Sequence, residues 1–113
     1  MTAVFSKQVG TYELLFISGY GNKDQLGFIY LYEPAGGYIG YLGIMKDGSA
    51  LPANVQWPNG LLNIHFHAAQ LTALMDTLRN EQPVFVKFNP DLKWGSLGTG
   101  REPVGEQEVP AAH

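Results

Sequence analysis

The sequence lacks cysteine, and it also lacks long apolar runs. Without cysteine the chain has no disulfides, no thiolate metal ligands and no cysteine nucleophile. No uninterrupted apolar stretch approaches the ~20 residues that a membrane helix requires, and residues 1–10 do not show the basic region and apolar run of a secretion signal. We therefore expect a cytoplasmic protein with no membrane partner.

Charged side chains are also scarce. They make up 15% of the chain, against 45% for apolar residues, and so low a charged fraction favours a surface that is partly covered by another subunit. The net charge of −3 argues against a protein whose main task is to bind phosphates, because non-specific affinity for nucleic acid comes mostly from Lys and Arg. Three of the ten acidic residues lie beyond Arg101, so the rest of the chain is nearly neutral.

The segment from Gly60 to Asn89 changes from a two-residue period to a helical period and back. Apolar residues alternate with polar ones over 61–67, recur at helical spacing over 68–80, and alternate again over 84–88. This pattern predicts a strand, a helix and a strand. No Ser, Thr, Asp or Asn stands at the expected helix N-cap, so we expect tertiary contacts to hold the start of the helix.

Alternation between turn-forming residues predicts four earlier strands, at 3–9, 12–18, 27–33 and 38–45. Their short connections favour an antiparallel meander, because parallel neighbours need long crossovers. Residues 51–59 are interpreted as an ordered loop anchored by Trp57, and residues 89–99 as a connection marked by Pro and Gly.

The sequence thus predicts an α+β fold with a mostly antiparallel five- or six-stranded sheet and one amphipathic helix between the last two strands. At 113 residues the chain suits one domain, at 1–99, followed by a flexible acidic tail at 100–113. One helix covers only one face of the sheet, while strands such as 12–18 are apolar on both sides. We expect another copy of the chain to supply the second covering layer, which makes the protein a homo-oligomer.

All six tyrosines lie within the first 41 residues, on or between predicted strands. Tyr30 and Tyr32 share a strand face with Phe28, and a neighbouring strand brings Tyr38 or Tyr41 to one side or the other. An aromatic sheet face can stack on bases, sugars or other flat ligands. Strand propensity or an oligomer interface explains the same pattern. The candidate ligand-binding residues are therefore Tyr30, Tyr32, Tyr38 and Tyr41.

His65 and His67 are two residues apart on a predicted strand, so both imidazoles can point toward one metal or one substrate. A zinc site needs at least one further ligand, and neither an HExxH motif nor a spaced carboxylate supplies one. Both histidines also fit structural roles, such as a hydrogen bond to a neighbouring backbone group. We add them to the candidate binding residues and predict neither a metal nor a cofactor.

Catalytic motifs are missing from the sequence. Residues 98–101 are rich in glycine but do not open a helix after a strand, no serine lies in a nucleophile elbow, and the carboxylates are dispersed. We therefore predict a small non-catalytic, homo-oligomeric binding or interaction module for a small-molecule or protein ligand. The alternative is a single-stranded nucleic-acid-binding protein that adds Lys23 and Lys87 to the tyrosines, and the third hypothesis is a metal-dependent or acid–base enzyme built on His65 and His67.

Overall fold

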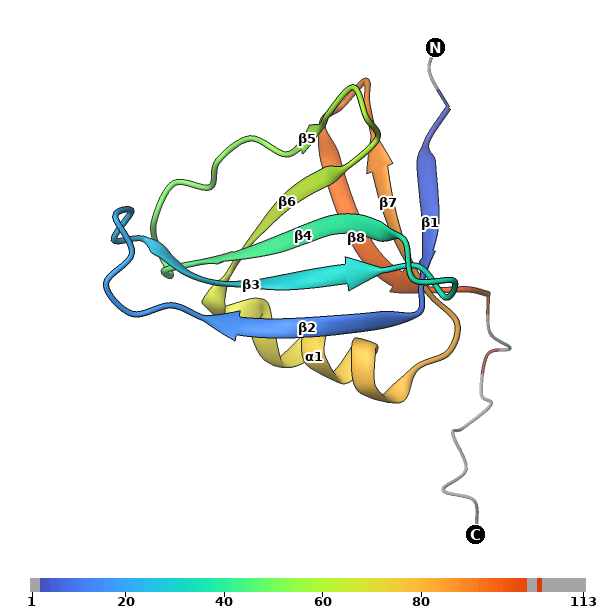
Figure 1. Ribbon diagram of the computed structural model, residues 1–113, viewed down its shortest axis with the longest axis horizontal. Coiled ribbons are helices and arrows are strands. Elements are labelled where there is room, and N and C mark those ends of the chain that lie inside the picture. Colours follow the sequence, from blue (N-terminus) through green and yellow to red (C-terminus); the bar gives the residue numbers. More distant parts are fainter. Residues whose placement is uncertain (1–2, 102–103, 105–113) are drawn as a thin grey trace, which may run out of the picture.

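The computed structural model describes residues 3–101 and 104, and it shows an α+β chain with two sheets and one α-helix in that part (Figure 1). In chain order the strands and helices are β1 Phe5–Val9, β2 Thr11–Phe16, β3 Gln25–Tyr32, β4 Tyr38–Met45, β5 Val55–Gln56, β6 Leu62–His67, the 3-10 turn Ala68–Gln70, α1 Leu71–Asn80, β7 Val84–Asn89 and β8 Trp94–Thr99. The predicted α+β class is confirmed. The predicted helix lies between β6 and β7, and β8 is a further strand after the one that the sequence predicts to be last.

The larger sheet has five strands in the order β2-β3-β4-β6-β5, and the smaller has three in the order β1-β7-β8. Strands β2, β3 and β4 form the predicted antiparallel meander. The larger sheet is mixed, however, because β4 and β6 run parallel. The long connection between them, which carries β5, provides the crossover that a parallel pair requires.

A bend at Gly10 separates β1 from β2 and assigns them to different sheets. The Gly10 N–H donates to the carbonyl of Tyr32 at 2.7 Å, although Tyr32 is already the partner of Thr11. Gly10 and Thr11 thus both lie opposite Tyr32. Two residues opposite one form a β-bulge, which bends and twists a strand. A Cβ at Gly10 would overlap the backbone of Pro34. Figure 1 shows the outcome, in which the strands of the smaller sheet run across those of the larger.

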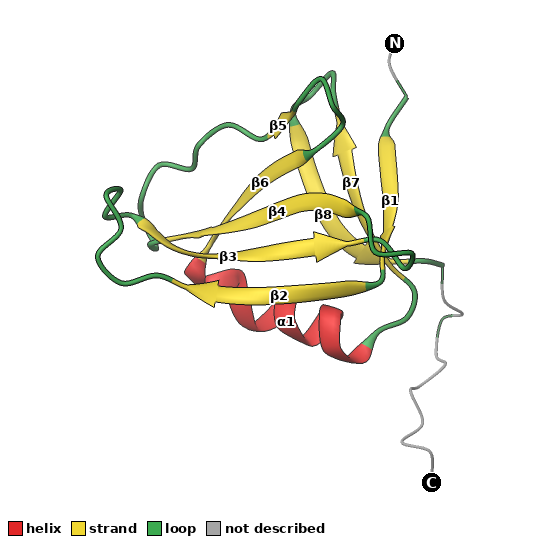
Figure 2. Cartoon of the chain, viewed as in Figure 1, coloured by secondary structure: helices red, strands yellow, loops and turns green. Residues whose placement is uncertain are grey.

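The core lies between the two sheets and the helix. Its buried apolar side chains are Ile29, Leu31, Ile39, Leu42, Ile44, Leu62, Ile64, Leu74, Met75, Val86 and Phe88. Figure 2 shows α1 along one side of the larger sheet, where Leu74 and Met75 supply its buried stripe. The other face of that sheet is left outside this core.

Tertiary contacts hold the start of the helix, as the missing N-cap residue predicts. Asp47 accepts a hydrogen bond from the N–H of Ala69 at 2.8 Å, and the Gln70 side chain accepts one from the N–H of His67 at 3.3 Å. No side chain caps α1 at Gln70 itself. Asp47 belongs to the turn after β4, so the meander and the helix are fixed to each other.

Two segments differ from their predicted form. Residues 94–99, interpreted as a connection, form β8 and pair with β7, because Gly95 and Gly98 interrupt the alternation that identifies a strand. The predicted loop at 51–59 contains the short strand β5, and Trp57 is 49% exposed instead of buried as an anchor.

The predicted tail lies outside the described residues except for Gly100, Arg101 and Val104. Within the part of the chain that the structure describes, no helix combines the length and apolar character needed to cross a membrane.

The helix packing gives a direct prediction. Leu74 is 7% exposed, so Leu74→Asp places an unpaired charge in the core and should lower the free energy of unfolding by about 3 kcal/mol or more. Ala73→Asp makes the same change at an exposed position of α1 and should have little effect. Chemical denaturation of both variants tests this, and similar losses in the two would show that the buried stripe is misassigned.

Candidate functional site: an aromatic face on the larger sheet

Aromatic side chains gather on the face of the larger sheet that points away from the core. Along β3, buried residues alternate with half-buried ones, so Ile29 and Leu31 enter the core while Phe28, Tyr30 and Tyr32 point outward. We call this surface the aromatic face. Its members are Tyr20, Phe28, Tyr30, Tyr32, Tyr38, Tyr41 and Trp57, together with Asn63 and His65.

Strand register explains why these residues meet. Tyr30 lies opposite Tyr41, and Tyr41 lies opposite Asn63 on the parallel neighbour β6. In the next row Phe28 lies opposite Gly43, which lies opposite His65. Cross-strand partners share a face of the sheet, so each row of the sheet brings aromatic and polar side chains side by side.

The rings contact one another in one continuous network. Phe28 is stacked on Tyr30 at 5.8 Å between centroids and meets Tyr41 edge to face at 4.8 Å. Tyr38 adjoins Tyr30 at 6.3 Å and Tyr32 at 5.5 Å. These separations lie in the range of favourable aromatic pairs. The structure therefore brings together the tyrosines that the sequence nominates at positions 30, 32, 38 and 41.

Asn63 links the network to Trp57. In the amide orientation that satisfies its neighbours, its side-chain oxygen accepts from the Trp57 indole N–H at 2.9 Å and from the Tyr41 hydroxyl at 3.2 Å. The indole is thus held by its polar edge while half of its surface stays exposed. Asn63 precedes His65 by two residues on β6 and shares its strand face, and nothing in the sequence pattern distinguishes it as part of the site.

His65 covers Gly43. A Cβ at Gly43 would lie 2.6 Å from Cδ2 of the imidazole, so the glycine creates the space that the ring occupies. The imidazole meets Tyr41 edge to face at 6.0 Å. Its Nδ1 is buried without a hydrogen-bond partner among the described residues, and burial lowers the pKa of His65 below 6.5. The ring is therefore neutral at neutral pH.

His67 takes a different role from His65. Its Nε2 hydrogen bonds with the backbone carbonyl of Ser49 at 2.7 Å, where the ring N–H is the donor. This contact fastens the long β4–β6 connection to the end of β6 and leaves His67 engaged with backbone. Among the described residues no group of three His, Asp or Glu side chains is placed to hold a metal ion.

The aromatic face is polar at its hydroxyls and nearly free of charge. The Tyr32 hydroxyl donates to Glu13 at 2.6 Å, and this hydrogen bond raises the pKa of Tyr32. Burial raises the pKa of Tyr38 to about 12 and also raises that of Tyr41. These phenols stay protonated well beyond neutral pH and offer uncharged donors and acceptors.

The two lysines of the nucleic-acid hypothesis separate in the fold. Lys23 lies in the β2–β3 loop, the same loop in which Tyr20 meets Phe28 at 6.2 Å. Lys87 lies on β7, in the smaller sheet. The structure therefore leaves Lys23 near one end of the aromatic face and assigns Lys87 to a different sheet.

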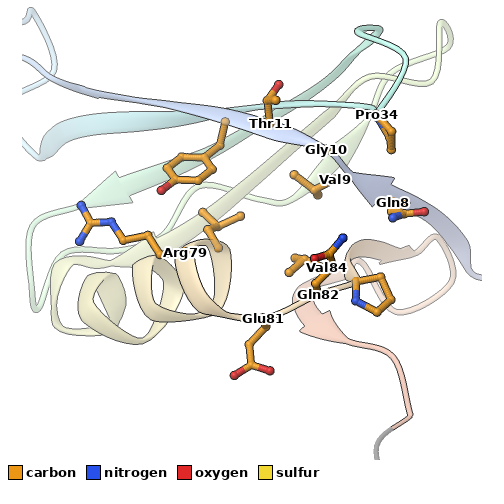
Figure 3. Close-up of a pocket in the computed structure, with 12 residues that line it drawn as sticks. Gln8, Val9, Gly10, Thr11, Pro34, Arg79, Glu81, Gln82 and Val84 are labelled. Carbon is orange, nitrogen blue, oxygen red and sulfur yellow. The ribbon is translucent and has the colours of Figure 1, made fainter. Parts of the chain in front are cut away.

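Two pockets in the described part of the chain lie outside most of this face. A pocket of about 630 Å³ lies where β1 bends into β2, lined by residues that include Gly10, Tyr12 and Arg79. Figure 3 shows Arg79 projecting from α1 at one end of the lining residues, and Glu81 with its carboxylate pointing away from them. None of the residues nominated from the sequence lines it. A smaller pocket of about 260 Å³ includes Tyr38.

Comparison with known protein families, with curated proteins and with solved structures finds no match for this chain.

The Gly43–His65 contact predicts a titration. Gly43→Ala should displace the imidazole, relieve its burial and move the pKa of His65 up toward 6.5. In the wild type the unfolded chain takes up this proton first as pH falls, so the contribution of His65 to stability is present above pH 6.5 and declines below it. The variant should lose less stability over the same pH interval.

Histidine proton NMR measures the pKa, and melting curves at several pH values measure the stability. Gly98→Ala is the matched control, because nothing lies within 4 Å of a Cβ built there. An unchanged His65 pKa in Gly43→Ala would contradict this account of the contact.

Proposed function

We propose that this protein is a small non-catalytic, homo-oligomeric binding module that holds a flat partner on the aromatic face. The observation that carries the proposal is the continuous ring network on the sheet face opposite the core. Three of its rings remain well exposed: Tyr20 at 48%, Tyr38 at 39% and Trp57 at 49%. A contiguous exposed aromatic surface is typical of a binding site.

Packing within the fold does not account for these rings. The core on the other side of the sheet is already filled by the helix and the smaller sheet. No other segment of the described chain covers Tyr38 or Trp57 enough to bury it. Leaving apolar area in water forgoes about 25 cal/mol for each Å², so a partner that covers the rings gains free energy on binding.

The network also prepares the face for binding. Neighbouring rings limit the motion of Tyr30 and Tyr41, and Asn63 holds both Tyr41 and Trp57 by hydrogen bonds. Side chains that are ordered before binding cost less conformational entropy when the partner arrives. The hydroxyls and the Asn63 amide add directional contacts at the edges of a stacked ligand.

The chemistry of the face favours a flat partner with little charge. Glu13 is already engaged by Tyr32, and His65 is neutral. Nucleobases, sugar rings and aromatic side chains meet these conditions, since each has a face for stacking and an edge for hydrogen bonds. The same arrangement supports a binding role over a catalytic one, because it offers no nucleophile paired with a base.

Single-stranded nucleic acid is the second candidate, and the spread of exposed rings favours it. Tyr20 adjoins the Phe28 end of β3 and Tyr38 adjoins the Tyr32 end, a span of about 13 Å along the strand. Lys23 follows Tyr20 in the same loop, and Lys46 begins the turn after β4. Two phosphate contacts predict a shallow salt dependence, with a slope of about −1.4 in log K against log salt.

Fluorescence of Trp57 tests the proposal. The chain has two tryptophans, so a Trp94→Phe background isolates Trp57. Adenosine represents an uncharged flat ligand, and oligothymidylate represents single-stranded nucleic acid. Either probe should change the Trp57 signal in a saturable way, and Tyr41→Leu should weaken binding by about tenfold because a stacking ring is lost.

Tyr12→Leu is the control. Tyr12 lies on β2 and lines the pocket near Gly10, so this variant should bind like the background. Salt-sensitive binding of oligothymidylate alone selects the nucleic-acid candidate, whereas binding of adenosine with little effect of salt selects an uncharged partner. Equal losses in the two variants, or no binding of either probe, would contradict a stacking role for the face.

A further inference from the structure

Strand β2 forms an open edge of the larger sheet. It pairs with β3 on one side and with no strand on the other among the described residues. Its outer residues are apolar on both faces, with Leu14 36%, Leu15 44% and Phe16 60% exposed. Such an edge is a template for another strand unless lysine, proline or a bulge blocks it. Thr11–Phe16 contains neither Lys nor Pro, and the bulge lies before it, at Gly10.

The hydrogen-bond pattern shows which backbone groups point outward from this edge. Ile17 donates to the carbonyl of Leu26 at 2.9 Å, in line with the β2–β3 register, so the odd-numbered residues of β2 direct their N–H and C=O groups toward β3. The even-numbered residues therefore direct theirs to the free edge. They are Tyr12, Leu14 and Phe16, which are placed symmetrically about Leu14.

This arrangement is self-complementary. A two-fold axis at Leu14, perpendicular to the sheet, sets Leu14 opposite the same residue of a second copy and Tyr12 opposite the second copy's Phe16. All three outward-facing residues then exchange backbone hydrogen bonds as antiparallel partners. This register sets Glu13, the single charge of the strand, opposite Leu15 of the second copy, so it meets no like charge. Its carboxylate accepts a hydrogen bond from Tyr32 of its own sheet.

We propose that two copies of this chain dimerise by pairing their β2 edges antiparallel about Leu14, forming one continuous sheet. The proposal specifies the contact for the homo-oligomeric part of the proposed function and rests on that part. Because the axis is perpendicular to the sheet, the aromatic faces of both copies lie on the same side. A flat ligand or a strand of several flat groups then meets a doubled row of rings.

Cysteine cross-linking tests this contact. The chain contains no cysteine, so an introduced thiol is the only one present. Directly paired residues of a hydrogen-bonded antiparallel pair have Cα atoms about 5.5 Å apart, a separation within the Cα range that disulfides span. Leu14→Cys should therefore form a disulfide-linked dimer under mild oxidation. The matched control is Leu92→Cys, at an apolar position 70% exposed in the β7–β8 turn, and it should cross-link at least about tenfold more slowly.

A second variant blocks the backbone edge itself. The Leu14 N–H points away from β3, so Leu14→Pro removes a free-edge donor without removing a bond to β3. Sedimentation at high micromolar concentration should show a dimer for the wild type and a monomer for Leu14→Pro, while circular dichroism reports that the variant is folded.

The outcomes separate this inference from the proposed function. A dimer that persists in Leu14→Pro, or equal cross-linking of the two cysteine variants, overturns the β2 contact and leaves the oligomer in place. A monomeric wild type overturns both the contact and the oligomer. The titration followed by Trp57 fluorescence measures ligand binding at the aromatic face, and its outcome does not depend on either of these results.

Discussion

The close backbone approach of Gly10 to Pro34 is the constraint on which the architecture depends. A side chain at Gly10 would overlap Pro34, so only glycine allows the first strand to bend at this point. At the bend the chain passes from β1 in the smaller sheet to β2 in the larger one. The smaller sheet and α1 then enclose the core on the inner face of the larger sheet, and the aromatic side chains remain on its outer face.

Two glycines on β4 also allow close approaches, and these position residues of the candidate site. At Gly40 a side chain would overlap the backbone of Leu62, and at Gly43 it would meet the His65 ring. These close approaches allow β6 to pair parallel with β4 in the observed register. That register places Asn63 beside Tyr41, so the contacts that fix the fold also position the polar groups of the aromatic face.

Sequence periodicity predicts most of the fold, because strands and helices that bury one face carry a regular pattern. The meander, the helix and the strands on either side of it follow from such patterns. These patterns do not identify β8, because the backbone of Gly95 packs against Ile64 where a strand would normally present a side chain. Nor do they predict the parallel pairing of β4 with β6. Which strand lies beside β4 depends on how the long connection between β4 and β6 folds.

The sequence also predicts one part of the candidate site and not the other. Alternation predicts which tyrosines share a strand face, and their concentration in one segment indicates that they lie close in space. Sequence alone does not separate His65 from His67, because the difference lies in what each ring contacts: Gly43 and Tyr41 for His65, and the Ser49 carbonyl for His67. The role of Trp57 depends on Asn63, and the pairing of these two residues appears only once β5 and β6 are adjacent.

Amide chemical-shift mapping of the full chain with adenosine tests the central claim most directly, because it reports on every part of the surface at once. The account predicts shifts concentrated on β3, β4 and β6 around Tyr30, Tyr41 and Asn63. Shifts concentrated instead around Gly10 and Arg79, in the pocket at the bend, would show that the working surface is on the other side of the sheet and would contradict the claim.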